Sequence, residues 1–357
     1  MADIYNVSDY LDINTTDQMH DDPCSNLNKS ESFWTWITVC RLIFAILGIS
    51  GNGLVVTVYL KKHLIRNSAS YFIVCLAAAD LISSMAMIPI PRKKYVENTA
   101  LGNLYCKVIF SSLLLWVSVF ASVLLLTVLT VDRYIAVVYP TKYKVIFKFA
   151  RLKYMVLAIC FFSFVFYTYS IYITDVIDCE CQIKWPNEVF RIFIGVCLFL
   201  LQYFLPVCIM VVVNLKIIYN LKNQARNLMR RNTSCRNPGV SLMRARRKMI
   251  RMVIIVVVIF IICWTPDQVM HFAYILDLVD GQYLYSAPYQ GFVMMAFSNS
   301  CANPIIYMFV NEQLRNGVKD CLPQSIRQLV RIENNSYHGS SVAVKKEGKG
   351  TGYETVC

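Results

Sequence analysis

Asp132, Arg133 and Tyr134 end a long apolar segment, from Val108 to Ile135, that has no other acidic or basic residue before Asp132. A charged side chain in the hydrocarbon region of a membrane costs about 2.5 kcal/mol or more. It is retained where it faces protein or water, which makes this pair a candidate functional site. The alternative is that the segment ends at Thr130, with the pair among lipid headgroups, where long charged side chains reach water cheaply.

The apolar segments of this chain are long enough to cross a membrane, which takes about 20 residues in a helix. Seven segments qualify: residues 34–60, 69–91, 106–138, 152–174, 190–220, 250–277 and 284–310. The sequence therefore predicts an all-α membrane protein, a seven-helix transmembrane bundle over residues 34–310. We expect an N-terminal tail at 1–33, a short amphipathic eighth helix at 311–322 and a disordered tail at 323–357.

The charged residues predict the orientation of the bundle. Residues 216–251 contain many Lys and Arg and no acid, whereas residues 1–33 hold seven acids against Lys29 alone. Because Lys-rich and Arg-rich loops stay in the cytoplasm, we expect an extracellular N-terminus, a cytoplasmic C-terminus and a multi-pass plasma-membrane protein. The net charge of +13 indicates contact with membrane lipids on the cytoplasmic side, and no soluble basic domain suggests nucleic-acid binding.

Residues 1–33 contain no signal-peptide pattern, so the first span is expected to act as the signal anchor. Asn6, Asn14 and Asn28 begin glycosylation sequons on the predicted outer side. Asn232 and Asn334 begin the same motif on the predicted inner side, so the motif alone does not decide glycosylation.

Enzyme and transporter functions find no support in this sequence. It offers no nucleophile–base pair, no Cys and His spacing suited to zinc and no internal repeat.

Six short motifs occur in order along the predicted spans. They are Gly51-Asn52, Leu76-Ala77-Ala78-Ala79-Asp80, Asp132-Arg133-Tyr134, Pro206, Cys263-Trp264-Thr265-Pro266 and Asn303-Pro304-Ile305-Ile306-Tyr307. Over about residues 34–322 this arrangement resembles the rhodopsin-like (class A) G-protein-coupled receptors. The segments 181–186 and 299–304 are similar to those of the somatostatin, galanin and allatostatin peptide receptors.

Several positions depart from the family pattern. Span four lacks the usual tryptophan and proline, Asn214 replaces a tyrosine of span five, and Leu314 replaces an aromatic residue after Tyr307. Cys106 is about two residues further from Arg133 than in the family, which suggests an altered upper end of span three.

The resemblance implies a sodium site around the mid-span carboxylate of Asp80. The other oxygen donors would come from Ser122, Asn299, Ser300 and Asn303. Hard cations prefer such oxygen ligands, and no other cofactor is expected. The alternative is a protonated Asp80 that hydrogen-bonds to Asn303 and Asn52.

The resemblance also implies an activation switch. Arg133 would pair with Asp132 at rest and move toward a heterotrimeric G protein on activation. Pro266 removes a backbone donor and kinks span six, with Trp264 as a hinge residue or, alternatively, a large core residue. The switch also includes Tyr134, Asn303, Pro304 and Tyr307. No acid lies at the inner end of span six, so we do not expect an ionic lock to span three. We therefore expect some basal activity.

Asp267, Gln268 and His271 follow Trp264 at i+3, i+4 and i+7, which places all four on one helix face. We interpret this face as ligand-binding, together with Leu115, Val119, Tyr289 and Gln290. A buried carboxylate needs a partner, either a basic group of the ligand or an internal cation at 92–94 or Lys107. His271 is equally well explained as a rim histidine.

The ligand class follows from charge. No acid occurs in span three above Asp132, and Leu115 replaces the aspartate of amine receptors; span seven has no lysine for retinal. Acidic outer loops favour a cationic peptide by electrostatic steering, although exposed acids also simply aid solubility.

The resemblance implies a disulfide between Cys106 and Cys181, while the additional Cys179 could pair with Cys24. Cys321 is a palmitoylation candidate or a free thiol. Serines and Thr351 of the tail are candidate sites for receptor kinases, with arrestin as a partner.

The sequence thus predicts a receptor for an extracellular neuropeptide that activates a G protein, of the inhibitory class by subfamily resemblance. The alternatives are a scavenging seven-helix receptor without G-protein coupling and a receptor for a non-peptide small ligand.

Overall fold

The computed structural model describes residues 34–91, 96–231 and 238–321, and its main feature is a bundle of seven long helical segments. The spans are α1 (Trp36–Lys61), α2 (Ser68–Ala86), α3–η2–α4 (Ala100–Tyr105, Cys106–Phe110, Leu113–Val138), α6 (Phe149–Ile173), α7–η3–α8 (Glu188–Leu198, Phe199–Phe204, Leu205–Arg231), α9 (Pro238–Ile275) and α10 (Ala287–Val310). All seven are long and apolar enough to cross a membrane. The predicted seven-helix fold class is therefore confirmed.

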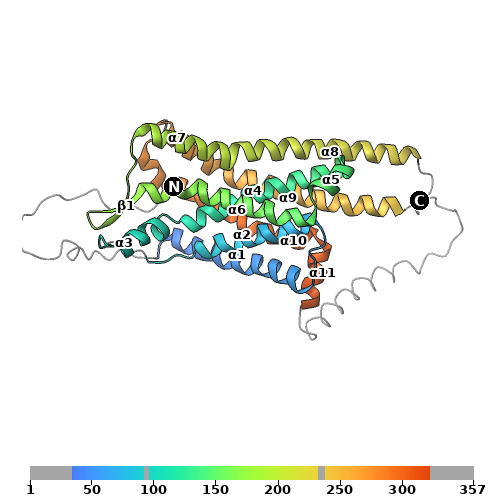
Figure 1. Cartoon of the computed structure of the whole chain (residues 1–357), viewed down its shortest axis with the longest axis horizontal. Helices are drawn as coiled ribbons and strands as arrows, with labels where there is room; N and C mark the ends of the chain where they lie inside the picture. Colours follow the sequence, from blue (N-terminus) through green and yellow to red (C-terminus); the bar gives the residue numbers. More distant parts are fainter. Residues whose placement is uncertain (1–33, 92–95, 232–237, 322–357) are drawn as a thin grey trace, which may run out of the picture.

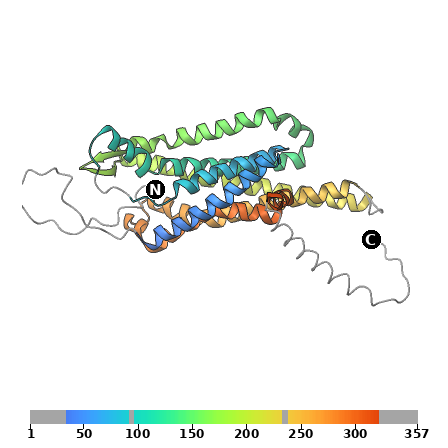
Figure 2. The same ribbon diagram turned by 90° about the horizontal axis from the view of Figure 1, so that it is seen from below.

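The bundle is elongated, and its two ends carry different short elements (Figures 1 and 2). The hairpin end carries α3, the strands β1 (Thr174–Ile177) and β2 (Glu180–Ile183), and η4 (Gly281–Tyr285). The opposite end, here called the α11 end, carries α5 (Pro140–Ile146) and α11 (Glu312–Cys321). In Figure 1, α11 runs across the bundle rather than along it.

Polar side chains mark where several helices begin. Oxygens of Thr35, Asn67, Thr99, Asn187 and Ser286 accept hydrogen bonds from backbone amides of the first turn. These caps satisfy amides that have no partner inside the helix.

The interior of the bundle is one continuous apolar cluster, in which Phe72, Phe120 and Phe260 are almost fully buried. Large apolar side chains such as Phe161 and Leu157 lie exposed on the outer face of α6. Lipid tails are as apolar as these side chains, so a membrane helix need not bury them against protein.

A small antiparallel hairpin interrupts the otherwise helical fold and was not predicted. It pairs Thr174 with Ile183 and Val176 with Cys181, and its two turn residues, Asp178 and Cys179, both have positive φ angles. Two-residue hairpin turns of this kind match the right-handed twist of the strands.

The disulfide between Cys106 and Cys181, implied by the family resemblance, is confirmed. It joins β2 to η2, so the hairpin is covalently attached beside α4. Cys179 is also disulfide-bonded. The predicted partner, Cys24, lies outside the described residues, as do the sequons at Asn6, Asn14 and Asn28 and the tails at 1–33 and 323–357.

Two spans contain a π-helical segment. In the third span, η2 is followed by Ser112 in a left-handed conformation with φ of 53°, which separates the end that bears Cys106 from α4. This irregularity matches the expected alteration at the upper end of span three.

In the fifth span, η3 ends two residues before Pro206. Proline cannot donate to the carbonyl four residues earlier, and its ring crowds that carbonyl. The helix widens locally at η3 instead of ending.

The contact between α1 and α2 generates a stability prediction at Gly48. A Cβ at Gly48 would lie 2.1 Å from the Ser84 hydroxyl oxygen and 2.8 Å from the Ser84 Cβ. We expect Gly48→Ala to cost about 1–3 kcal/mol through overpacking, which exceeds the gain in helix propensity of about 0.5–1 kcal/mol.

The measurement is the Tm of the purified protein in lipid nanodiscs. Gly291→Ala in α10 is the matched control, because a Cβ at Gly291 would meet nothing within 4 Å. A Gly48→Ala protein as stable as the control would contradict the close helix contact.

Candidate functional site

A buried polar cluster surrounds Asp80 in the middle of the bundle. The fully buried Asp80 carboxylate accepts hydrogen bonds from Ser122 Oγ at 2.8 Å, Ser300 Oγ at 3.1 Å and Asn303 Nδ2 at 2.8 Å. These donors come from α4 and α10, so the cluster joins three spans: α2, α4 and α10. Most of the predicted sodium-site side chains therefore converge on one carboxylate.

The donor chemistry of this cluster fits a sodium ion. The Oδ1 atoms of Asn299 and Asn303 are buried and have no hydrogen-bond partner within the described structure. Neutral and anionic oxygens around one carboxylate are the ligands that hard cations prefer. No group of three or more His, Cys, Asp or Glu side chains suited to a metal occurs in the described ranges.

Asn52 does not hydrogen-bond to Asp80 as the alternative interpretation required. Its Nδ2 instead donates to the backbone oxygens of Gly48 and Ser300, both at 3.0 Å. Asn52 thus ties α1 to α10 beside the cluster.

Asp132 and Arg133 form a second polar group toward the α11 end. Arg133 Nε donates to Asp132 Oδ2 at 2.8 Å, and Nη2 donates to the same oxygen. Ser68 Oγ donates to Asp132 Oδ1 at 2.5 Å, and the Tyr143 hydroxyl lies 2.6 Å from Ser68 Oγ and 3.4 Å from Arg133 Nη2. The sequence indicated the Asp132–Arg133 pair, but not Ser68 or Tyr143, which come from α2 and α5.

A cavity of about 520 Å³ opens beside Arg133. Its walls include Tyr143 of α5, Ile250 and Met252 of α9, and Asn311 at the start of α11. Its size is within the range of about 300–1,000 Å³ typical of ligand sites. The switch arginine therefore lines an accessible cleft between several helices.

Two buried polar residues near this region lack partners. The Tyr307 hydroxyl and both amide atoms of Asn214 are buried and make no hydrogen bond among the described residues. Tyr134, the third residue of the switch motif, is half-buried and packs edge-on against Tyr139, with ring centroids 6.0 Å apart.

The predicted ligand face of α9 lies buried toward the hairpin end. Trp264, Asp267, Gln268 and His271 are all less than 9% exposed. The Asp267 carboxylate accepts from Gln268 Nε2 at 2.8 Å, and Tyr289 of α10 lies beside it. Trp264 Nε1 has no partner in the described part of the chain.

No lysine or arginine within the described ranges forms an ion pair with Asp267. Lys107, one of the internal candidates, pairs instead with Asp175 at 3.4 Å. Residues 92–94, the other candidates, lie outside the described residues.

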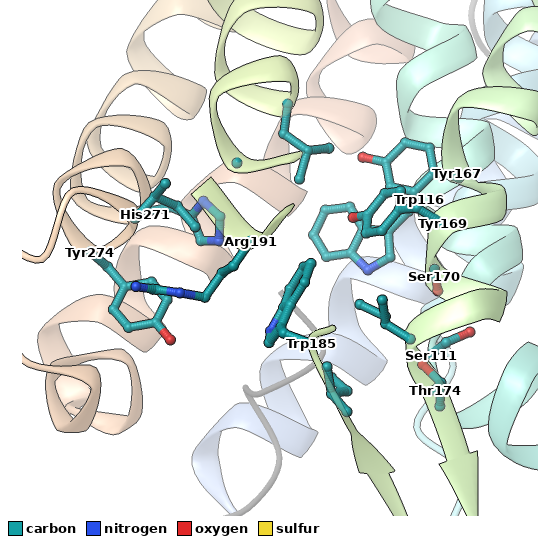
Figure 3. Close-up of a pocket in the computed structure, with 15 residues that line it drawn as sticks. Ser111, Trp116, Tyr167, Tyr169, Ser170, Thr174, Trp185, Arg191, His271 and Tyr274 are labelled. Atoms are coloured by element: carbon teal, nitrogen blue, oxygen red, sulfur yellow. The ribbon is translucent and has the colours of Figure 1, made fainter. Parts of the chain in front are cut away.

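An aromatic cavity lies next to this face of α9 (Figure 3). Arg191, His271 and Tyr274 are on one side, Trp116, Tyr167 and Tyr169 are on the other, and Trp185 of the loop after β2 lies between them. The remaining volume is about 40 Å³, which holds little more than a few water molecules. Of the predicted ligand residues, only His271 lines this cavity.

The other predicted ligand residues lie in the core around it. Leu115 and Val119 belong to the main apolar cluster, and their neighbour Trp116 provides the wall of α4. Gln290 donates from Nε2 to the backbone oxygen of Leu284 at 2.9 Å, while its Oε1 is buried without a partner among the described residues.

Sequence reasoning missed the contribution of spans four and five. The Tyr167 hydroxyl donates to Gln202 Oε1, and the hydroxyls of Tyr203 and Thr265 lie 2.6 Å apart. Gln202 and Tyr203 are part of η3, so the widened turn before Pro206 directs both toward the bundle interior. Pro206 was visible in the sequence. The residues that bond to Gln202 and Tyr203, which are Tyr167 of α6 and Thr265 of α9, could not be predicted from it.

Three further predicted residues lie on α9, α10 and α11. Pro266 and Pro304 are inside α9 and α10, respectively. Cys321 is an exposed free thiol at the last residue of α11.

The sequence comparison agrees with this arrangement. Residues 51–307, which are more than two thirds of the chain, match the model of the family described as 7 transmembrane receptor (rhodopsin family). The matched region runs from the polar contact of α1 with α10 to Tyr307, and it contains the Asp80 cluster, the Asp132–Arg133 pair and Pro266 inside α9. The chain belongs to the rhodopsin family of seven-transmembrane receptors.

Proposed function

We propose that this receptor binds an extracellular peptide through a basic group and activates a heterotrimeric G protein. Receptors of the rhodopsin family bind extracellular ligands and signal through G proteins, and its members are not enzymes. The observation that carries the peptide proposal is the buried Asp267 carboxylate, which has no cationic partner among the described residues.

Asp267 supports a cationic ligand because a buried carboxylate gains most from a charged partner. Its partners among the described residues are neutral: the Gln268 amide donates a hydrogen bond to it, and the Tyr289 hydroxyl lies beside it. A ligand Lys, Arg or amine would add a charge-assisted hydrogen bond in a site that excludes water. The aromatic side chains of the neighbouring cavity suit an apolar side chain of the same peptide, which would have to enlarge the cavity on binding.

Trp264 connects the ligand face to the kink in α9. It lies one turn before Asp267, and its ring packs against Phe260 with centroids 6.1 Å apart. Pro266, which lies between Trp264 and Asp267, has no N–H to donate to the carbonyl of Ile262. A ligand that displaces this face would therefore bend α9 where the helix is weakest.

The α11 end supports G-protein binding. The 520 Å³ cavity exposes Arg133 between α4, α5, α9 and α11. Once Arg133 leaves Asp132, its guanidinium could donate to carbonyl oxygens of a G-protein helix, while Ser68 would keep Asp132 hydrogen-bonded. Ligand and G protein would then tighten each other's binding reciprocally.

A sodium ion held by Asp80, Ser122, Ser300, Asn299 and Asn303 would neutralise the buried charge and favour the resting packing of α2, α4 and α10. The unpartnered oxygens of Asn299 and Asn303 support this assignment.

The remaining proposals follow from charge and from family resemblance. The hairpin end and the N-terminus would face the outside of the plasma membrane, where Asn6, Asn14 and Asn28 would be glycosylated. The α11 end would face the cytoplasm, with Cys321 palmitoylated and the tail bound by receptor kinases and arrestin. An inhibitory G protein is the proposed subtype.

The ligand contact is tested by Asp267→Asn, which keeps the side-chain shape and removes the charge. A charge-assisted contact contributes about 1.5–3 kcal/mol, so agonist potency should fall roughly tenfold to a hundredfold. The assay is nucleotide exchange with purified receptor and a library of basic peptides. Asp175→Asn, which removes the same charge from an exposed position of β1, should change potency little.

The decisive comparison uses a peptide whose basic group is neutralised. If Asp267 contacts that group, the neutral peptide should lose little further potency on the Asp267→Asn receptor. Fully additive losses would exclude the contact.

The sodium site is tested without any ligand. Binding to the folded state alone raises stability by mass action, so the Tm of the purified receptor should be a few degrees higher in sodium chloride than in choline chloride at equal ionic strength. Asp80→Asn should abolish this difference. A sodium-dependent shift that persists in the variant would place the ion elsewhere.

Tyr143→Phe tests the contacts that hold the switch at rest. The change removes the hydroxyl that bridges Ser68 and Arg133. Loss of one net hydrogen bond of about 1 kcal/mol should raise ligand-free nucleotide exchange roughly threefold to fivefold. Tyr154→Phe, which changes an exposed tyrosine of α6, is the control, and equal basal rates in wild type and both variants would argue against this role.

A further inference from the structure

The hairpin end of α9 is attached to α7 at three successive turns. Arg191, Gly195 and Phe199 are spaced four residues apart on α7–η3, so they lie on one helix face. They contact Asp277, Ile275 and Phe272, respectively. We call these six residues the α7–α9 clamp.

The ion pair of the clamp is well held. Arg191 Nη2 donates to both carboxylate oxygens of Asp277, at 2.9 and 3.2 Å. Arg191 Nε donates to Glu188 of the same helix at 2.7 Å. The guanidinium also lies 5.7 Å from the ring centroid of Tyr274. Figure 3 shows these two side chains next to each other.

Burial distinguishes this arginine from the other described ion pairs outside the Asp132–Arg133 switch. The Arg191 side chain is only 10% exposed, although its partners Asp277 and Glu188 are 69% and 75% exposed. The Lys107 and Arg315 side chains of the other pairs are 31% and 41% exposed. Solvent-exposed pairs contribute little because water screens them and their side chains lose entropy. A guanidinium that is held by two carboxylates and a ring loses less side-chain entropy for each hydrogen bond that it forms.

The other two contacts of the clamp are steric. A Cβ at Gly195 would lie 2.6–2.7 Å from three side-chain carbons of Ile275, so only glycine lets the helices approach this closely. One turn further, the rings of Phe199 and Phe272 stack with centroids 4.1 Å apart and an interplanar angle of 13°.

The clamp holds only the hairpin end of α9. The contacts with Phe272 and Ile275 lie between Pro266 and the end of α9, and the contact with Asp277 lies two residues past that end. Asp267, Gln268 and His271 are on the same short segment. Toward the α11 end, Ile250 of α9 packs in a small separate cluster with Val137 and Ile217. The two ends of α9 are therefore held by different contacts, with the proline between them.

We propose that Arg191 is a positioning residue: with Gly195 and Phe199 it fixes residues 267–277 of α9 on α7. The clamp holds the Asp267 side of the ligand site in register and confines movement of α9 to the part before Pro266, toward the α11 end. Its role in ligand binding rests on the proposed function, whereas the attachment of the segment does not.

The experiment is hydrogen–deuterium exchange of the full-length receptor in lipid nanodiscs, without ligand or G protein. Exchange reports the local opening of a segment. Arg191→Gln and Asp277→Asn should each accelerate exchange of amides in 267–278 about threefold to tenfold, as expected for loss of a partly buried ion pair. Amides of 250–258 should stay within about twofold, because that end has its own contacts.

Glu188→Gln is the matched control. It removes the other carboxylate from Arg191 but leaves the bridge between the helices, so exchange of 267–278 should change less than about twofold. The double variant Arg191→Gln/Asp277→Asn should exchange no faster than the faster single variant, because both remove one interaction.

A steric test is independent of charge. Gly195→Ala should also accelerate exchange of 267–278, whereas Gly291→Ala should not. Unchanged exchange in Asp277→Asn, or an equal effect of Glu188→Gln, would overturn the role of the ion pair. Acceleration in 250–258 as large as in 267–278 would show general destabilisation and would equally overturn it.

Receptor signalling is read out separately. If the exchange results hold but no basic peptide activates the receptor, the clamp stands and the proposed ligand class fails. If activation depends on Asp267 but exchange of 267–278 ignores Asp277→Asn and Gly195→Ala, the ligand site stands and the clamp is wrong.

Discussion

Inside a lipid bilayer no water replaces a lost hydrogen bond, and the interior of this receptor depends on that constraint. Asp80, Asp132 and Asp267 are all buried, but their carboxylates are satisfied differently. Asp80 accepts from three neutral donors, Asp132 from Arg133 and Ser68, and Asp267 from Gln268. Among the described residues, Asp80 and Asp267 therefore have neutral side-chain donors, whereas Asp132 has a cationic partner.

The same constraint shapes the helices. Pro206 removes a donor that no solvent can replace, and the chain responds with the π-helical segment η3, which directs Gln202 toward Tyr167 and Tyr203 toward Thr265. Pro266 lies inside α9 between two regions of dense packing. The irregular backbone at η3 thus occurs where neighbouring helices supply hydrogen-bond partners. Polar side chains enter the core at the same place.

The two ends of the bundle differ in how much space they leave. The cavity at the α11 end is about 520 Å³ and contains Arg133, whereas the aromatic cavity at the hairpin end is about 40 Å³. Cores pack densely and tend to switch between discrete arrangements rather than deform continuously. A ligand that entered the aromatic cavity would therefore have to displace side chains on α4, α6 or α9. The α7–α9 clamp limits which of these helices can move there.

The sequence alone determined the features that depend on the local pattern of residues, which are the spans and the helix faces. Apolar length predicted the seven spans, and helical spacing placed Asp267 and His271 on the face of Trp264. The Asp132–Arg133 pair and the residues around Asp80 were recognisable from motifs. Only the tertiary structure decided the partners that come from distant segments: Arg191 with Asp277, 86 residues away, Trp116 in the cavity wall, and Asn52 bonded to Ser300 rather than Asp80. Periodicity specifies which face a residue occupies, but packing of separate helices specifies what that face meets.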